Sequence, residues 1–328
     1  MPNNDNLLEV RHLETGFQTE AGLLKAVDDV SFSVPQGACV GIVGESGCGK
    51  SVTAMSIVRL LPQPMGKILG GEILFKGQDL TQASLDDMYR IRGGDIGVIF
   101  QEPMTALNPV HTIGRQIAES LMLHRNLGPK EAKDAAVELL NRVRIPAPRQ
   151  RADEFPHQLS GGMRQRVVIA IALACNPSLV IADEPTTALD VTVQAQILDL
   201  LTRLQYEMGS SSILITHDLG VIAETCDRVV VMYAGRVVER ASAKNLFNNP
   251  VHAYTRGLLN SMPRLSTERK SRLLTIPGQV APIQDFVAGC RFCQRMGVPA
   301  VELTERPPFV EVSPDHWVES CPRCSRLG

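Results

Sequence analysis

The sequence predicts an α/β domain over residues 1–245 and a smaller, irregular extension over residues 246–328. Strand-like apolar runs alternate with helical segments through residues 36–240, which is typical of a sheet covered by helices. A glycine-rich stretch, Gly44–Ser51, lies between one such run and a predicted helix. Beyond residue 245 proline becomes frequent and periodicity fades, so we place the domain boundary within residues 245–265.

The predicted strands are short apolar or β-branched runs that end at turn residues. Residues 7–35 are expected to form short strands with a turn near Gly22, and a hairpin is expected around Tyr233-Ala234-Gly235. The remaining strand candidates are Val40–Val43, residues 95–100, Leu179–Ala182, Ser212–Thr216, Val229–Met232 and Arg236–Glu239.

Helices are predicted where apolar residues recur with helical period. A helix is expected to begin at Lys50, and the pattern from Thr112 to about Arg144 is helical and charged, with turn residues at Gly128-Pro129. Further candidates are Met163–Cys175, ended by Asn176-Pro177, and the amphipathic segment Val193–Tyr206.

Composition favours a folded protein with an ordinary surface. Apolar residues make up 44% of 328 residues and the net charge is −2, which gives no support for nucleic-acid binding. The longest apolar stretch, Val167–Ala182, is interrupted by Asn176-Pro177-Ser178 and is shorter than the roughly 20 residues of a spanning helix. The N-terminus has no signal-peptide pattern, so we expect any membrane role to require a partner.

The segment Gly44–Ser51 fits the phosphate-loop pattern G-x-x-x-x-G-K-S at every fixed position. Glycines let the backbone turn its N–H groups onto phosphate oxygens, Lys50 supplies a cation, and Ser51 offers a hydroxyl to Mg²⁺. A chance glycine-rich turn is the alternative, and the flanking strand and helix argue against it. The expected ATP-binding residues are Gly44, Glu45, Ser46, Gly47, Cys48, Gly49, Lys50, Ser51 and Val52.

An acidic pair, Asp183-Glu184, ends the apolar run Leu179–Ala182. Two adjacent acids there are costly unless they meet a cation or take part in proton chemistry. Downstream of a phosphate loop, Asp183 is expected to serve Mg²⁺ and Glu184 to act as the general base for water. A strand that simply runs out into a polar turn is the alternative.

Four further segments decide the class. Leu159–Arg166 contains Ser160-Gly161-Gly162 and matches the signature motif of ABC ATPases, and Gln101 stands where that family has its Q-loop glutamine. Thr216-His217-Asp218 resembles the switch histidine, and Ala188-Leu189-Asp190 resembles the D-loop. The resemblance covers residues 7–245 and implies a P-loop NTPase of the ABC type: a RecA-like core, an antiparallel β subdomain and an α-helical signature subdomain.

The resemblance also implies roles for single residues. Two such ATPase domains pair head to tail, so that Ser160, Gly161 and Gly162 of one cover the γ-phosphate held by the other. His217 is expected to contact the γ-phosphate of ATP. Gln101 is expected to join Ser51 and Asp183 at Mg²⁺. Asp190 is assigned to the nucleotide site with the D-loop. Phe17 is placed where relatives stack an aromatic ring on adenine, with a core phenylalanine as the alternative.

Several stretches are similar to the bacterial oligopeptide/dipeptide importer ATPases: Gln101–Pro109, Phe155–Ser160, Val231–Gly235, Pro250–Thr255, Ile276–Gly278 and Gly289–Phe292. This resemblance implies an ATPase that drives peptide import at the cytoplasmic face of the inner membrane. Its implied partners are a second ATPase subunit, preferably a paralogue, two permeases and a solute-binding protein. Nickel or glutathione import by the same architecture remains open.

The extension carries Cys290-x-x-Cys293 and Cys321-x-x-Cys324. The family pattern Gly-Cys-x-Phe-x-x-Arg-Cys is kept at Cys290 and Phe292, but Met296 replaces its second cysteine. Four thiolates in two C-x-x-C pairs suit zinc or an iron–sulfur cluster, and some relatives are thought to hold such a cluster. The alternatives are free cysteines or a tail weakly linked by disulfides under oxidation.

Two rival functions are weighed against transport. A soluble ABC ATPase acting on DNA or the ribosome usually carries two ATPase domains or long coiled-coil insertions, and this sequence has neither. A non-hydrolysing regulatory subunit often lacks the base or the switch histidine, whereas Glu184 and His217 are both present.

Overall fold

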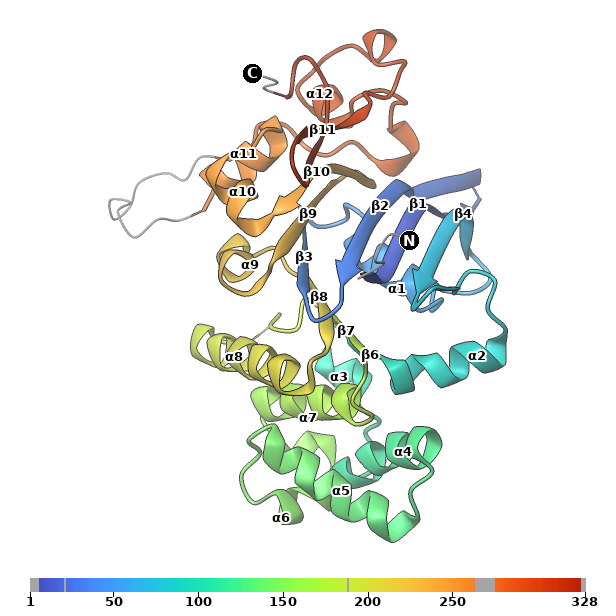
Figure 1. The fold of residues 1–328 in the computed structure, drawn as a ribbon, viewed down its shortest axis with the longest axis vertical. Helices are drawn as coiled ribbons and strands as arrows, with labels where there is room; N and C mark the ends of the chain where they lie inside the picture. Colours follow the sequence, from blue (N-terminus) through green and yellow to red (C-terminus); the bar gives the residue numbers. More distant parts are fainter. Residues whose placement is uncertain (1–5, 21, 188, 263–274, 326–328) are drawn as a thin grey trace. The chain divides into compact units, whose positions relative to one another are not determined.

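The computed structural model describes residues 6–20, 22–187, 189–262 and 275–325 (Figure 1). The chain divides into two compact units, which are described separately. Unit 1 is built mainly from Pro35–Ala38 and Gln82–Ile215, and unit 2 from Leu8–Val34, Cys39–Thr81 and Thr216–Gly328.

Unit 1 contains three parallel strands in the order β6, β7, β8. They span Ile96–Ile99, Leu179–Asp183 and Ser211–Ile215. All residues of β7 and β8 are buried, as expected for a parallel sheet covered on both faces. The register pairs Ile99 with Ala182 and Asp183 with Ile215, so the carboxyl ends of the strands lie at one edge.

The helices of unit 1 are α2 (Leu85–Arg90), α3 (Pro103–Ala106), α4 (Ile113–Arg125), α5 (Pro129–Arg142), α6 (Pro148–Ala152), α7 (Gly161–Leu173) and α8 (Val191–Met208) (Figure 1). A helix-like π turn covers Ile91–Asp95, and a 3-10 turn covers Pro156–Gln158. Helices α4, α5, α6 and α7 pack against one another. They form the predicted helical subdomain.

Two helix starts lie two residues before the predicted ones, and side-chain capping explains both. The Ser160 hydroxyl accepts a hydrogen bond from the Met163 N–H, so α7 begins at Gly161. The Asp190 carboxylate accepts one from the Val193 N–H, so α8 begins at Val191. Apolar periodicity locates the body of a helix, whereas the cap fixes its first residue.

Unit 2 contains an antiparallel sheet in the order β2, β1, β4, β5. These strands span Gly22–Pro35, Asn6–Thr19, Gly66–Phe75 and Gln78–Asp79. Residues 7–35 were expected to form several short strands, but they form two strands of 14 residues. A register shift between Arg11 and Glu14 lets β1 continue past its polar middle.

The second sheet of unit 2 runs β11, β12, β10, β9, β3. Strand β3 (Cys39–Val43) is parallel to β9 (Arg228–Tyr233), and β10 (Arg236–Ser242) forms the predicted hairpin with β9. Strands β11 (Phe309–Ser313) and β12 (His316–Glu319) come from the extension, and β12 pairs with β10. The segment after residue 245 therefore adds strands to this sheet, which its fading periodicity did not predict.

The helices of unit 2 are α1 (Lys50–Ile57), α9 (Leu219–Thr225), α10 (Ala243–Asn248), α11 (Ala253–Asn260) and α12 (Arg291–Arg295), with 3-10 turns at Ile283–Asp285 and Ala300–Glu302. Helix α1 begins at Lys50, as predicted. Within the described ranges, every helix is too short or too polar to cross a membrane.

Candidate functional site

The predicted nucleotide-site residues come from both units, and each set is described within its own unit. In unit 2, Gly44–Gly49 connects the fully buried strand β3 to α1. Gly44 has φ 152°, and an added Cβ would lie 2.2 Å from the Met232 carbonyl oxygen. Gly49 has φ 102°, and a Cβ there would lie 2.9 Å from the Ala26 oxygen. Both positions therefore require glycine.

Lys50 is 5% exposed, and its ammonium group stays within the loop. Its Nζ donates to the Gly44 oxygen at 2.8 Å and to the Glu45 oxygen at 3.0 Å. A buried ammonium needs such acceptors, and a phosphate oxygen is a stronger one. Within the loop, Ser46 and Gly47 are exposed, Cys48 and Gly49 are buried, and Ser51 and Val52 on α1 are half-buried. Burial raises the pKa of the Cys48 thiol, which keeps it neutral.

The end of the loop is supported by the β9–β10 hairpin. The Gly235 N–H donates to the Cys48 oxygen at 3.0 Å, and the Asp28 N–H donates to the Gly235 oxygen at 2.8 Å. Glu45 is held by the extension, because its N–H donates to the Tyr254 hydroxyl at 2.9 Å and its carboxylate contacts Arg295. Sequence reasoning assigned no role to Tyr254 or Arg295.

His217 follows the last residue of β8 and is exposed. Its neighbour Asp218 caps α9 by accepting from the N–H groups of Gly220 and Val221. The Thr216 hydroxyl accepts from the Asp218 N–H at 3.0 Å. These bonds fix the backbone on both sides of His217, so its imidazole is presented from an ordered turn.

Phe17 is half-buried on β1 and is paired in register with Gly66 on β4. A Cβ at Gly66 would lie 3.1 Å from the Phe17 ring. The ring thus covers a glycine backbone on one side, an arrangement that suits either adenine stacking or a partly covered surface aromatic.

In unit 1, the acidic pair lies at the end of β7. Asp183 is 6% exposed as the last residue of the strand, and Glu184 follows with a left-handed φ of 47°. The Glu184 N–H donates to the Ile215 oxygen at 2.9 Å. A left-handed backbone at a residue other than glycine is uncommon and often marks a functional turn.

The Glu184 carboxylate is positioned by two donors on one oxygen. Its Oε2 accepts from the Gln101 Nε2 at 3.1 Å and from the Thr187 hydroxyl at 2.9 Å. The structure therefore brings together Gln101 and Glu184, which the sequence predicted as separate motif members. Thr187 was missed, because a threonine three residues after an acid carries no signal of its own.

The signature residues lie at the exposed start of α7. Ser160 and Gly161 are exposed and Gly162 is half-buried, so the first N–H groups of this 13-residue helix face outward. A Cβ at Gly162 would lie 2.8 Å from Val193 at the start of α8, where Asp190 is the cap. Because Gly162 has no Cβ, the start of α7 can pack closely against the start of α8. This helix start is suited to hold an anion.

The four cysteines of the extension are buried and adjacent. The Sγ atoms of Cys293 and Cys324 are 3.2 Å apart, those of Cys293 and Cys321 are 3.5 Å apart, and those of Cys290 and Cys324 are 3.7 Å apart. All four Sγ atoms lie within 4.8 Å of one another. The structure therefore brings the predicted ligand set together.

Comparisons with known proteins identify the family of this chain. Residues 27–187 match the ABC transporter family, and residues 238–296 match the C-terminal region of oligopeptide/dipeptide transporters. The chain is 52% identical over 316 residues to the probable peptide ABC transporter ATP-binding protein of Sinorhizobium fredii, covering 96% of this chain and 94% of that protein. It is 49% identical over 315 residues to the oligopeptide transport ATP-binding protein of Bacillus subtilis, covering 96% and 88%.

A solved dimeric ATP-binding cassette, in a post-hydrolysis state bound to ADP and Pi, is similar with a TM-score of 0.65 and 29% identity, over 72% of this chain and 98% of that one. The matches define the class: this chain is an ABC ATPase, which uses ATP and Mg²⁺. More narrowly, it belongs to the family of ATP-binding subunits of oligopeptide/dipeptide ABC transporters.

Proposed function

We propose that this chain hydrolyses ATP to drive peptide import from the cytoplasmic face of the inner membrane, as a peripheral subunit. The observation that carries the hydrolytic role is the Glu184 carboxylate, held at the end of buried β7 by Gln101 and Thr187. The peptide substrate is supported by the match of residues 238–296 and by the names of the relatives.

In this proposal the phosphate loop binds the nucleotide. Lys50 exchanges its two carbonyl partners for β- and γ-phosphate oxygens, and the N–H groups of Gly47, Gly49 and Lys50 join it. Ser51, Gln101 and Asp183 would hold Mg²⁺. When bound, the ion supplies positive charge against the phosphate oxygens. Phe17 offers its ring to the adenine.

Glu184 acts as the general base and takes a proton from the attacking water. Fixing its Oε2 with two donors limits rotation of the carboxylate, so the group is oriented before water arrives. His217 contacts the γ-phosphate and orients the water and Glu184. Gln101 contacts Glu184 as well as the ion site, so it is placed to report the state of the nucleotide to a permease.

The signature turn acts on a second subunit. Ser160, Gly161 and Gly162 present the start of α7, which would cover the γ-phosphate held by the partner's loop, with Asp190 beside it. A similar cassette was solved as a dimer. ATP would close such a dimer and hydrolysis would reopen it. The second ATPase is proposed to be a paralogue, and the further partners are two permeases and a solute-binding protein.

A second proposal concerns Cys290, Cys293, Cys321 and Cys324, which we assign to one structural metal centre. A tetrahedral zinc with Zn–S bonds of about 2.3 Å separates its sulfurs by about 3.8 Å. The observed distances of 3.2, 3.5 and 3.7 Å lie at or somewhat below that edge. An iron–sulfur cluster places further atoms between the thiolates and would need the cysteines to move apart, so zinc is favoured.

Metal analysis of anaerobically purified protein tests the second proposal. About one zinc per chain without visible absorption is expected. Iron together with a visible absorption band would mean that the site holds an iron–sulfur cluster and not zinc. Absence of both metals would refute the site.

Glu184→Gln tests the hydrolytic role. The variant should still bind ATP and lose at least about 100-fold in turnover, because a general base contributes about that factor or more. Thr202→Val, on the exposed side of α8, is a matched control that should keep the parent rate. Turnover of Glu184→Gln at the parent rate would refute the assignment.

Lys50→Ala should instead weaken nucleotide binding.

A further inference from the structure

Helix α12 in the extension contacts the phosphate loop directly, although about 250 residues separate them in the chain. The Arg295 guanidinium is 5% exposed and pairs with the Glu45 carboxylate through two bonds, Nη1–Oε2 at 2.5 Å and Nη2–Oε1 at 3.3 Å. The same guanidinium donates to the oxygens of Pro277 and Gly278. These added acceptors fix its position against the loop.

The backbone of Glu45 is held by the extension as well. The Glu45 N–H donates to the hydroxyl of Tyr254, which is fully buried on α11. The Tyr254 ring packs against Tyr233 and Phe292, with centroids 4.6 and 5.7 Å away. Phe292 lies on α12, so one packed cluster links α11 and α12 to the first turn of the phosphate loop.

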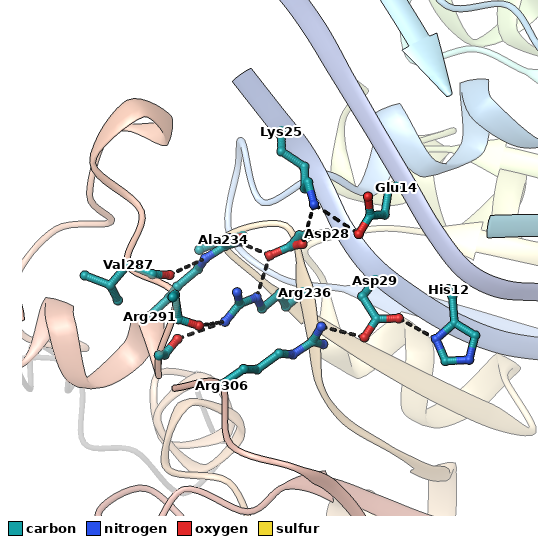
Figure 2. Close-up of polar contacts among 12 residues, drawn as sticks. His12, Glu14, Lys25, Asp28, Asp29, Ala234, Arg236, Val287, Arg291 and Arg306 are labelled. Carbon is teal, nitrogen blue, oxygen red and sulfur yellow. Dashed lines mark hydrogen bonds and ion pairs between the residues drawn. The ribbon is translucent and has the colours of Figure 1, made fainter. Parts of the chain in front are cut away.

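The N-terminal end of α12 is connected to the C-terminal end of the phosphate loop through the β9–β10 hairpin. Arg291 donates to the Ala234 oxygen and, at 2.7 Å, to Asp28 Oδ2, as Figure 2 shows. Arg236 donates to the same carboxylate oxygen at 2.8 Å and to the oxygens of Ala288 and Gly289, just before Cys290. The hairpin turn held in this way donates to the Cys48 oxygen.

Arg295 compensates the negative charge of Glu45 in the phosphate loop. A carboxylate in a loop that binds polyphosphate repels its ligand, and Glu45 is such a group. Arg295 is the cation paired with it. The two-bond contact between the Arg295 guanidinium and the Glu45 carboxylate sets the opposite charges against each other at the loop.

The cysteine cluster is part of the same helix. Cys290 caps α12, accepting from the Cys293 N–H, and Cys293 lies between Arg291 and Arg295 in sequence. The thiols of Cys290 and Cys293 and both arginines are therefore carried by the same short segment.

We propose that Arg295 is a positioning residue for ATP binding, and that α12 couples the cysteine cluster to the nucleotide affinity of the phosphate loop. The inference rests on the proposed ATPase function. Loss of Arg295 leaves the Glu45 carboxylate uncompensated beside the phosphates. Loss of the cluster shifts Arg295 and has the same consequence.

The test is a double-mutant cycle on the full-length chain, with the affinity for a fluorescent N-methylanthraniloyl ATP in Mg²⁺ as the readout. Arg295→Met should weaken binding about tenfold, as expected for one uncompensated charge near the phosphates. Glu45→Gln/Arg295→Met should return to within about threefold of the parent, and Arg295→Lys should keep most of the affinity. If Arg295 only stabilised the fold, removing the Glu45 carboxylate would not restore the affinity for the probe.

Arg306→Met is the matched control, because Arg306 pairs with Asp29 at 2.6 Å in the same unit. It should bind within about twofold of the parent. Affinity of Arg295→Met equal to that of the control, or no rescue in the double variant, would overturn the charge role. Failure of the parent chain itself to bind the probe would refute the ATPase proposal instead.

Cys293→Ser tests the coupling. It should weaken binding of the probe about as much as Arg295→Met, and it should have little further effect in the Arg295→Met background. Metal content and far-UV circular dichroism are measured on each variant, so loss of the cluster is separated from unfolding. Equal affinity of Cys293→Ser and the parent, with the metal lost and the fold kept, would overturn the coupling.

Discussion

Asp28 is the buried anion between two arginines, and Asp28→Asn should destabilise unit 2. Its side chain is 11% exposed, and those of Arg236 and Arg291 are 7% and 8% exposed. Removing one partner of a buried ion pair costs about 3–5 kcal/mol. Asparagine keeps one acceptor oxygen for the guanidinium groups, so we expect a loss of about 2–4 kcal/mol.

The assay is urea unfolding followed by the fluorescence of Trp317, the single tryptophan of the sequence. Trp317 lies on β12, so its emission reports on unit 2. With a slope of about 3 kcal/mol per molar urea, the midpoint should fall by about 1 M. Asp29→Asn is the matched control, because Asp29 is 36% exposed and its pairs should contribute less than about 1 kcal/mol.

The pH dependence follows from the same pair. Burial alone would raise the pKa of Asp28, but Arg236 and Arg291 outweigh it and lower the pKa. A carboxyl with a lowered folded-state pKa stabilises fully above its unfolded pKa of about 3.9 and loses that contribution as pH falls through the folded pKa. The gap between parent and Asp28→Asn should therefore be widest near neutral pH and shrink below about pH 4. A midpoint shift no larger than that of Asp29→Asn would refute the reasoning.

Three further predictions concern the loop, the signature helix and the cysteine cluster. Gly44→Ala should abolish nucleotide binding, because its Cβ would lie 2.2 Å from the Met232 oxygen, and retained binding of a fluorescent ATP would contradict the loop geometry. Ser160→Ala should cost about 1 kcal/mol of helix stability through its lost cap and also reduce ATPase turnover of the proposed dimer; unchanged turnover would count against the proposed signature role. If the proposed metal centre exists, Cys321→Ser should lose its metal and lower the unfolding midpoint reported by Trp317, and full metal retention would exclude Cys321 as a ligand.

Local features of this protein could be predicted from its sequence. The start of α1 at Lys50 and the buried strand before Asp183 follow from apolar runs and turn residues next to each other in the chain. The C-x-x-C spacings predicted the cysteine cluster, whose Sγ atoms the structure brings together. The acidic pair downstream of the phosphate loop predicted the role of Glu184, family resemblance predicted that of Gln101, and the structure shows that the two side chains are in contact.

Contacts between distant segments could not be predicted in this way. No local pattern in the sequence connects Arg295 with Glu45, or Arg291 with Asp28, because 250 and 263 positions separate them. The pairing of β12 with β10 was missed for a related reason. Strand β12 has only four residues, which are too few to show an alternation of apolar and polar side chains. Its partner β10 lies within residues 1–245, which the sequence predicted to be a separate domain.

Transport by the assembled complex tests the central claim most directly. The chain would be reconstituted in lipid vesicles with its proposed partners, namely two permeases, a second ATPase and a binding protein, and uptake of a radiolabelled peptide would be measured with Mg-ATP on the ATPase side. We predict peptide uptake that requires ATP and this chain, and that is lost with Lys50→Ala. Uptake that proceeds equally without this chain, or a complex that transports nickel or glutathione but no peptide, would contradict the account.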